Sequence, residues 1–135
     1  MQKNGIYNTL LSYHFGKENI FKNIGCYSVS QVVWYQGESN SCEKEGAVYL
    51  HLLEEMITDW RNALQCETLP FIVVEIHNYF YREDEGWYSI QRAQKQAEQS
   101  PFVRVIENED CEEPKEIHPS DKYTISKRIF EAMHY

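Results

Sequence analysis

Two short stretches of this sequence bring together residue types that could do chemistry. In residues 34–40 (WYQGESN), two amides, a glycine, a carboxylate and a hydroxyl follow one another within one turn. Glycine allows a close backbone approach to a ligand, and clustered amide donors suit the oxyanion of an acyl-transfer reaction. Ser39 or Asn40 could instead cap the turn into the next helix, so a catalytic and a structural interpretation both stay open.

The second stretch, residues 116–122 (EIHPSDK), contains His118 just after several carboxylates. An oriented imidazole that titrates near neutral pH is the commonest general base, and a neighbouring carboxylate can fix its tautomer. A lone histidine in a loop is more often a solvated residue without a catalytic role. The pattern around His118 therefore indicates a base only if the two stretches meet.

Metal and thiol chemistry have weaker support. The histidines are scattered and contain no H-E-x-x-H motif; they are His14, His51, His77, His118 and His134. The cysteines, at positions 26, 42, 66 and 111, show no C-x-x-C spacing, so we expect buried thiols and no metal site. Ser39 is not predicted as the nucleophile of a G-x-S-x-G elbow, because Ser41 occupies the position of the second glycine.

The elements that must position these residues follow from apolar runs that alternate with stretches of helical period, as in a βαβ protein. We expect strands at residues 31–36, 71–76 and 102–106, and helices at residues 44–64, 87–99 and 119 to about 133. The first run is continuous and predicts a strand buried on both faces of a parallel sheet. The core face of the last helix is expected to consist of Tyr123, Ile125, Ile129, Phe130 and Met133.

The carboxyl ends of these strands lead into loops at residues 37–42, 77–86 and 107–118, which hold the unusual residues of the chain. In a doubly wound sheet, ligands bind at this edge. The second loop and the helix after it are rich in aromatic side chains that could form a sugar-binding platform, although such side chains more often serve packing. These aromatic residues are Tyr79, Phe80, Tyr81, Trp87 and Tyr88.

Composition limits the remaining possibilities. With 135 residues the chain is one domain, residues 1–135, and its 42% of hydrophobic and 25% of charged residues are typical of a globular protein. A net charge of −8 argues against nucleic acid and anionic membranes as partners, since both require a basic surface. No apolar run approaches the ~20 residues of a membrane span. The start of the chain lacks the apolar core of a secretory signal, and nothing indicates a compartment.

Taken together, these stretches resemble the sialate O-acetylesterase family, a branch of the SGNH or GDSL-type hydrolases that includes related acetylxylan esterases. Residues 32–40 (VVWYQGESN) are very close to the family's V-I-W-Y-Q-G-E-S-N block. Further matches follow in the family's order: residues 5–8 (GIYN), Tyr49 with residues 59–61 (DWR), residues 69–71 (LPF), Trp87 with Ala93 and Gln94, and residues 117–119 (IHP) with Lys122 and Arg128.

The resemblance implies a flavodoxin-like three-layer α/β/α fold with a parallel sheet. It also implies hydrolysis of acetyl esters on sugars by a serine, a histidine base and an acid, without metal or organic cofactor. His118 would be the base, and Gln36, Gly37 and Asn40 would lie beside the oxyanion hole. The acid is Glu38 or a carboxylate ahead of the histidine. Related hydrolases often place Asp three residues before it, where this chain has Lys115, so the substitutes would be Glu116, Glu113 or Asp110.

One part of the family pattern is absent. The family's nucleophile sits in a G-Q-S-N-M-like or G-D-S-like block upstream of the segment that residues 5–8 resemble, and no serine here has a matching context. We therefore expect an N-terminally incomplete hydrolase domain, inactive alone, whose unpaired sheet edge favours self-association. The alternative is a non-catalytic sugar-binding module. An acidic protein favours a neutral over an anionic acetylated sugar, unless Arg82 or Arg92 supplies local positive charge.

Overall fold

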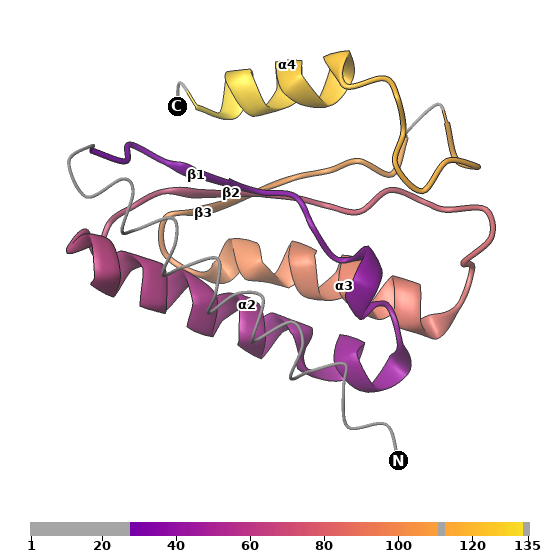
Figure 1. Cartoon of the computed structure of the whole chain (residues 1–135), viewed down its shortest axis with the longest axis horizontal. Helices are drawn as coiled ribbons and strands as arrows, with labels where there is room; N and C mark the ends of the chain where they lie inside the picture. The colour runs from indigo at the N-terminus through magenta and orange to yellow at the C-terminus, as the bar shows by residue number, and fades with distance from the viewer. Residues whose placement is uncertain (1–27, 111–112, 134–135) are drawn as a thin grey trace.

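The computed structural model describes residues 28–110 and 113–133 of the chain. In this part, three parallel strands form one sheet in the order β1 (Val32–Trp34), β2 (Phe71–Val74) and β3 (Val103–Ile106). Its α-helices are α2 (Glu43–Leu64), α3 (Glu85–Gln96) and α4 (Tyr123–Ala132). All three strands leave the sheet at the same end, as the parallel arrangement requires (Figure 1). The predicted α/β fold class is confirmed.

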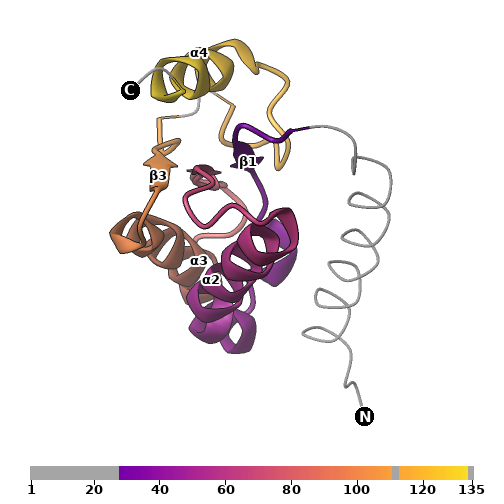
Figure 2. The same ribbon diagram turned by 90° about the vertical axis from the view of Figure 1, so that its left-hand side faces the viewer.

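The helices cover the sheet in two layers. Helices α2 and α3 lie against one face and α4 lies against the other, so the layers follow the predicted α/β/α order (Figure 2). Successive residues of a strand point to opposite faces. In β2, Phe71 and Val73 accordingly join the cluster packed under α2 and α3, while Ile72 and Val74 join Ile125 of α4.

The strands are shorter than the apolar runs that predicted them. Strand β2 ends at Val74. The Glu75 amide still donates to the Ile106 carbonyl of β3 at 3.0 Å, but the next residue is held by α3: Gln94 accepts a hydrogen bond from the Ile76 amide, and Gln91 donates one to the Ile76 carbonyl. The expectation that β1 is buried on both faces is wrong. Val33 is 42% exposed, because its face of β1 has little cover from the described elements.

Two helix starts also differ from the predictions: a side-chain cap explains the start of α3, and side-chain hydrogen bonds in the preceding loop explain the start of α4. Helix α3 begins at Glu85 because the Asp84 carboxylate accepts a hydrogen bond from the Trp87 amide at 3.0 Å. Before α4, the Glu113 carboxylate accepts hydrogen bonds from the Ser120 hydroxyl and the Asp121 amide. These bonds hold residues 119–122 in a loop, so α4 begins at Tyr123 and not at Pro119.

The predicted core face of α4 is only partly correct. Ile125 is buried and Ile129 packs beside it, with Ala132 completing a face of helical spacing. By contrast Tyr123 is 77% exposed, and Phe130 and Met133 are also exposed. Tyr123 and Phe130 lie outside the face defined by Ile125 and Ile129, which the helical repeat of 3.6 residues fixes once one residue is buried. Met133 is on the same side as Ile129 but follows the last residue of α4.

The cysteine prediction also needs correction. Cys42 is exposed at the start of α2 and Cys66 is half-buried, and both are free thiols, so the expectation of buried thiols fails at Cys42. Cys26 and Cys111 lie outside the described residues, as do residues 5–8 of the family comparison. None of the described helices combines the length and the apolar character that a membrane crossing demands.

Candidate active site

The loops that follow β1 and precede α4 meet at the end of the sheet where the strands leave. Nδ1 of His118 lies 3.9 Å from Oε1 of Glu38, which belongs to the short 3₁₀ helix η1 (Glu38–Asn40). Glu38 is largely buried, with 15% of its side chain exposed, whereas the His118 side chain is 76% exposed. The structure thus brings together the two stretches singled out in the sequence, at a distance slightly beyond a hydrogen bond.

Gly37 shapes the turn that carries Glu38. A Cβ atom at Gly37 would lie 2.7 Å from Cγ2 of Ile90 and 3.0 Å from Nε2 of Gln94, so only glycine lets β1 exit this close to α3. The close backbone approach that Gly37 permits is therefore to helix α3, whereas the sequence analysis related it to a ligand. The Gly37 amide donates a hydrogen bond to Oε2 of Glu38 at 3.0 Å, which orients the carboxylate.

The two amide side chains of this turn bond to each other. Gln36 donates to Oδ1 of Asn40 at 2.8 Å, and buried Asn40 donates to the Glu45 carboxylate at 3.0 Å. The backbone carbonyl of Gln36 accepts hydrogen bonds from the Tyr49 hydroxyl at 2.6 Å and from Nε2 of Gln94 at 2.9 Å. The side-chain amide of Gln36 has a second hydrogen, so Gln36 can still donate to a substrate oxygen, while buried Asn40 holds the Gln36 side chain in place.

Burial shifts the pKa of Tyr49. Desolvation raises the pKa of its hydroxyl to about 12, although hydrogen bonds with neighbouring side chains such as Trp34 act to lower this pKa. The hydroxyl is therefore protonated at neutral pH and acts as a donor to the Gln36 carbonyl.

The alternative acids lie elsewhere. The Glu113 carboxylate is bound by Ser120 and Asp121, and Asp110 forms an ion pair with Arg128 at 2.6 Å that lowers the pKa of the aspartate. Glu116 is exposed. In the described part of the chain, Glu38 is the one candidate acid within 4.0 Å of His118.

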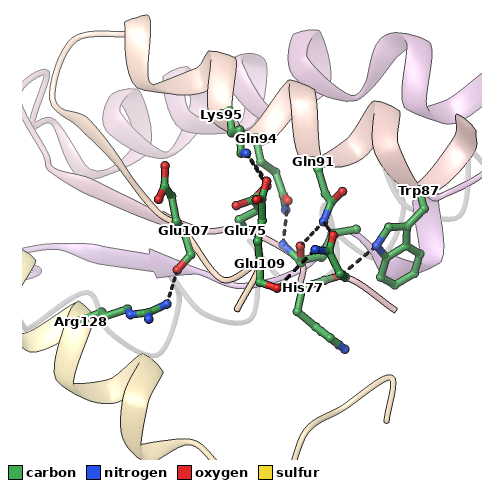
Figure 3. Close-up of polar contacts among 11 residues, drawn as sticks. Glu75, His77, Trp87, Gln91, Gln94, Lys95, Glu107, Glu109 and Arg128 are labelled. Carbon is green, nitrogen blue, oxygen red and sulfur yellow. Dashed lines mark hydrogen bonds and ion pairs between the residues drawn. The ribbon is translucent and has the colours of Figure 1, made fainter. Parts of the chain in front are cut away.

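Helix α3 supplies a set of polar contacts that the sequence reasoning missed. Trp87, Gln91 and Gln94 all form hydrogen bonds with the backbone at residues 76 and 77, just after β2 (Figure 3). Gln94 also reaches Gln36, so one side chain joins the exits of β1 and β2. The signal in the sequence was the presence of glutamines on the apolar face of a predicted helix, where a buried amide requires partners.

Two buried titratable groups follow β2. Glu75 is fully buried, with Nζ of Lys95 at 3.5 Å, and burial raises the pKa of its carboxyl. Lys95 also pairs with exposed Glu109 (Figure 3). His77 is buried as well, and desolvation lowers the pKa of its imidazole.

The described surroundings of His118 supply neither a bonded serine nor a cluster of metal ligands. Within residues 28–110 and 113–133, no serine hydroxyl forms a hydrogen bond with His118. Ser41 donates to the Glu38 carbonyl and Ser120 to the Glu113 carboxylate. The same residues contain no group of three or more His, Cys, Asp or Glu side chains that could hold a metal ion.

Comparisons with known proteins agree with the α/β fold. A carbohydrate acetylesterase from Xanthomonas citri has a similar structure, with a TM-score of 0.72 and 27% sequence identity over 77% of this chain. A protein from Arabidopsis thaliana shares the fold, with a TM-score of 0.58 and 22% identity over 70% of this chain. The matched parts span 25% and 39% of those two proteins. No curated protein matches the chain.

The family comparison covers nearly the whole sequence. Residues 4–134 match the family described as "Carbohydrate esterase, sialic acid-specific acetylesterase". This range contains both loops that meet at Glu38 and His118. The chain therefore belongs to the sialic acid-specific acetylesterase family of carbohydrate esterases.

Proposed function

We propose that this chain supplies the base and the acid of a carbohydrate O-acetylesterase site, with His118 as the general base and Glu38 as its acidic partner. The observation that carries the proposal is the 3.9 Å approach of His118 Nδ1 to Glu38 Oε1, across loops far apart in the sequence. A carboxylate at this nitrogen fixes the tautomer and stabilises the imidazolium that forms during catalysis. Catalytic hydrogen bonds are often longer without substrate and shorten when it binds.

The reaction follows from these roles. Nε2 of His118 takes the proton of a serine hydroxyl as its oxygen attacks the acetyl carbon of the ester. The proton then passes to the departing sugar hydroxyl, and water releases acetate from the serine by the same steps. The Gly37 amide already donates to Glu38, so the second amide hydrogen of Gln36, whose side chain is held by Asn40, is the better candidate to stabilise the oxyanion.

The serine of this mechanism is proposed to come from a segment outside residues 28–133. No described serine hydroxyl is bonded to His118, and removal of a nucleophile costs orders of magnitude in rate. Because no serine of the sequence, within or outside the described residues, stands in the family's nucleophile context, we expect the chain by itself to be inactive. A neutral acetylated sugar is the favoured substrate, because both arginines that could attract an anionic sugar are paired, Arg82 with Asp84 and Arg92 with Glu85.

The test is acetate release from an aryl acetate and from acetylated xylo-oligosaccharides. We expect no release by the purified chain, and release once the polypeptide encoded immediately upstream is fused to it. In the fusion, His118→Ala should lower kcat by roughly a thousandfold or more and Glu38→Gln by roughly a hundredfold. His51→Ala, at an exposed histidine of α2, is the matched control and should leave the rate unchanged. Activity that survives His118→Ala would reject the proposal.

One observation favours the non-catalytic alternative. Phe80, Tyr81 and Tyr88 are exposed, as a sugar-binding platform requires, and Lys115 lies over the Phe80 ring at 5.5 Å. Trp87 is buried and cannot take part. Binding of an acetylated sugar that is lost in Phe80→Ala and Tyr81→Ala, with no cleavage in the fused protein, would support this module over the esterase.

A further inference from the structure

Glu45 carries a buried carboxylate in the first turn of α2, just after η1 (Figure 1). A glutamate three residues after the N-cap residue of a helix commonly accepts a hydrogen bond from the amide of that residue. Here the N-cap residue is Cys42, and its amide donates to the Asn40 carbonyl at 2.8 Å. The Glu45 carboxylate is therefore left to another partner.

That partner is the side chain of Asn40. Nδ2 of Asn40 donates a hydrogen bond to Oε2 of Glu45 at 3.0 Å, and Oδ1 of Asn40 accepts one from Nε2 of Gln36 at 2.8 Å. Glu45 is 9% exposed and Asn40 is 1% exposed, so the bond between them is shielded from water, where hydrogen bonds are stronger. Three side chains thus connect α2 with the residue that precedes Gly37.

Helix α2 also holds the main chain of Gln36. The Tyr49 hydroxyl donates to the backbone carbonyl of Gln36 at 2.6 Å. Glu45 and Tyr49 are four residues apart and therefore lie on the same face of the helix. One helix face thus fixes Gln36 at its main chain directly and at its side chain through Asn40.

The chemistry of the groups gives this chain of bonds a direction. An ionised carboxylate only accepts hydrogen bonds, whereas a side-chain amide can present either its oxygen or its NH₂ group. Glu45 therefore requires Asn40 to turn its NH₂ group towards α2 and its oxygen towards Gln36. That oxygen in turn requires the NH₂ group of Gln36. A reversed amide at either position would set two acceptors or two donors against each other.

This direction matters for the group that Gln36 offers to a substrate. Its NH₂ group gives one hydrogen to Asn40 and has a second, which is the donor proposed for the oxyanion. With the Gln36 amide reversed, an oxygen would occupy the place of the NH₂ group and would repel an oxyanion.

We propose that Glu45 is a positioning residue: its carboxylate, acting through Asn40, fixes the orientation of the Gln36 side-chain amide and so keeps its NH₂ group available to the oxyanion. This inference rests on the proposed function, in which Gln36 stabilises the oxyanion. Its structural content, the control of the Gln36 amide from α2, can be tested without any esterase activity.

The test compares two substitutions of similar length. Glu45→Gln keeps an oxygen that can accept from Asn40, whereas Glu45→Met has none. By NMR, we expect Glu45→Met to speed hydrogen exchange of the Asn40 and Gln36 side-chain NH₂ groups by about tenfold, the factor that corresponds to one hydrogen bond. Glu45→Gln should keep exchange close to the wild-type rate. Glu43→Met, at an exposed glutamate of the same helical turn, is the matched control and should change neither group.

Two further readouts detect a loss of the fold. Exchange of the Val73 and Val74 backbone amides should be unchanged in all variants, since global loosening would speed it as well. If Glu45→Met does not fold, the wild-type chain still decides: the NH₂ groups of Asn40 and Gln36 should exchange about tenfold more slowly than that of exposed Asn62. Equal rates in the wild type, or equal protection in Glu45→Met and Glu45→Gln, would overturn the inference.

The catalytic consequence is measured in the fused protein. Glu45→Met should lower kcat by about a hundredfold, the effect of losing one oxyanion donor, with KM unchanged, and Glu45→Gln should restore most of the rate. A wild-type kcat in Glu45→Met, in a fusion that His118→Ala inactivates, would reject the positioning role and leave the proposed function standing. Activity that survives His118→Ala, with the NMR coupling intact, would reject only the proposed function.

Discussion

At the scale of single residues, Tyr49 connects burial with the shape of the turn after β1. Its hydroxyl donates to the Gln36 carbonyl, and its pKa is raised to about 12. An unfolded tyrosine ionises near pH 10, so above that pH the unfolded chain loses a proton that the folded chain keeps. Stability should therefore fall by about 1.4 kcal/mol for each pH unit between pH 10 and 12.

Urea unfolding of wild type and Tyr49→Phe checks this prediction. At pH 7 the phenylalanine variant should be less stable by about 1 kcal/mol, because it lacks the hydrogen bond. Since Tyr49→Phe has no hydroxyl to ionise, the difference between the two proteins should shrink above pH 10. A difference that stays constant up to pH 12 would disprove the assignment.

Glu75 makes a second prediction, which has the same physical origin as that of Tyr49. Burial raises the pKa of this carboxyl above that of the unfolded chain, so its contribution to stability is present in acid and declines as pH rises through the folded-state pKa. Glu75→Gln removes the ionisation, and we expect the variant to gain stability over wild type from pH 4 to pH 8, by about 1 kcal/mol or more. Glu109→Gln, at the exposed partner of the same lysine, is the control and should show no such gain.

At the scale of elements, the contact between α2 and α3 depends on glycines at their amino ends. A Cβ atom at Gly46 of α2 would overlap with Oγ of Ser89 in α3 and lie 2.9 Å from its Cβ. A Cβ atom at Gly86 of α3 would overlap with the backbone carbonyl oxygen of Ser41, which lies just before α2. The two helices can approach at this end because both positions lack a side chain.

Gly46→Ala should therefore destabilise the protein by about 1–3 kcal/mol, although alanine is the better helix former. Thermal unfolding of the single variant and of the double variant Gly46→Ala/Ser89→Gly separates the two effects. The second substitution removes the Ser89 side chain and should restore most of the lost stability. A stabilised single variant would mean that the helices separate without cost.

At the scale of the whole molecule, β1 forms one of the two edges of the described sheet. Its backbone pairs with β2 on one side, and the side chain of its middle residue, Val33, is exposed. An open edge strand can pair with another chain, whereas charged side chains on the edge oppose such pairing. We expect concentration-dependent self-association in sedimentation velocity. Val33→Lys should weaken it, and Val48→Lys, at an exposed valine of α2, should leave it unchanged.

The sequence by itself determined the elements and the end of the sheet at which the site lies. Alternating apolar runs and helical periods predicted the βαβ order, and parallel strands necessarily bring the loops after them to one end. The stretches around Glu38 and His118 could therefore be expected to converge before any coordinates were known. Both lie at this end, and Nδ1 of His118 is 3.9 Å from Oε1 of Glu38.

Only the tertiary structure decided which partners each residue has there. The sequence offered Glu38, or one of Glu116, Glu113 and Asp110 in place of an aspartate before the histidine. The path of the loop before α4 brings His118 near Glu38, while Glu113 and Asp110 bond elsewhere. The role of Gly37 against α3, the exposure of Phe130 and the burial of His77 also depend on neighbours distant in sequence. Periodicity fixes the spacing of side chains along an element, but burial and contact are properties of what packs against it.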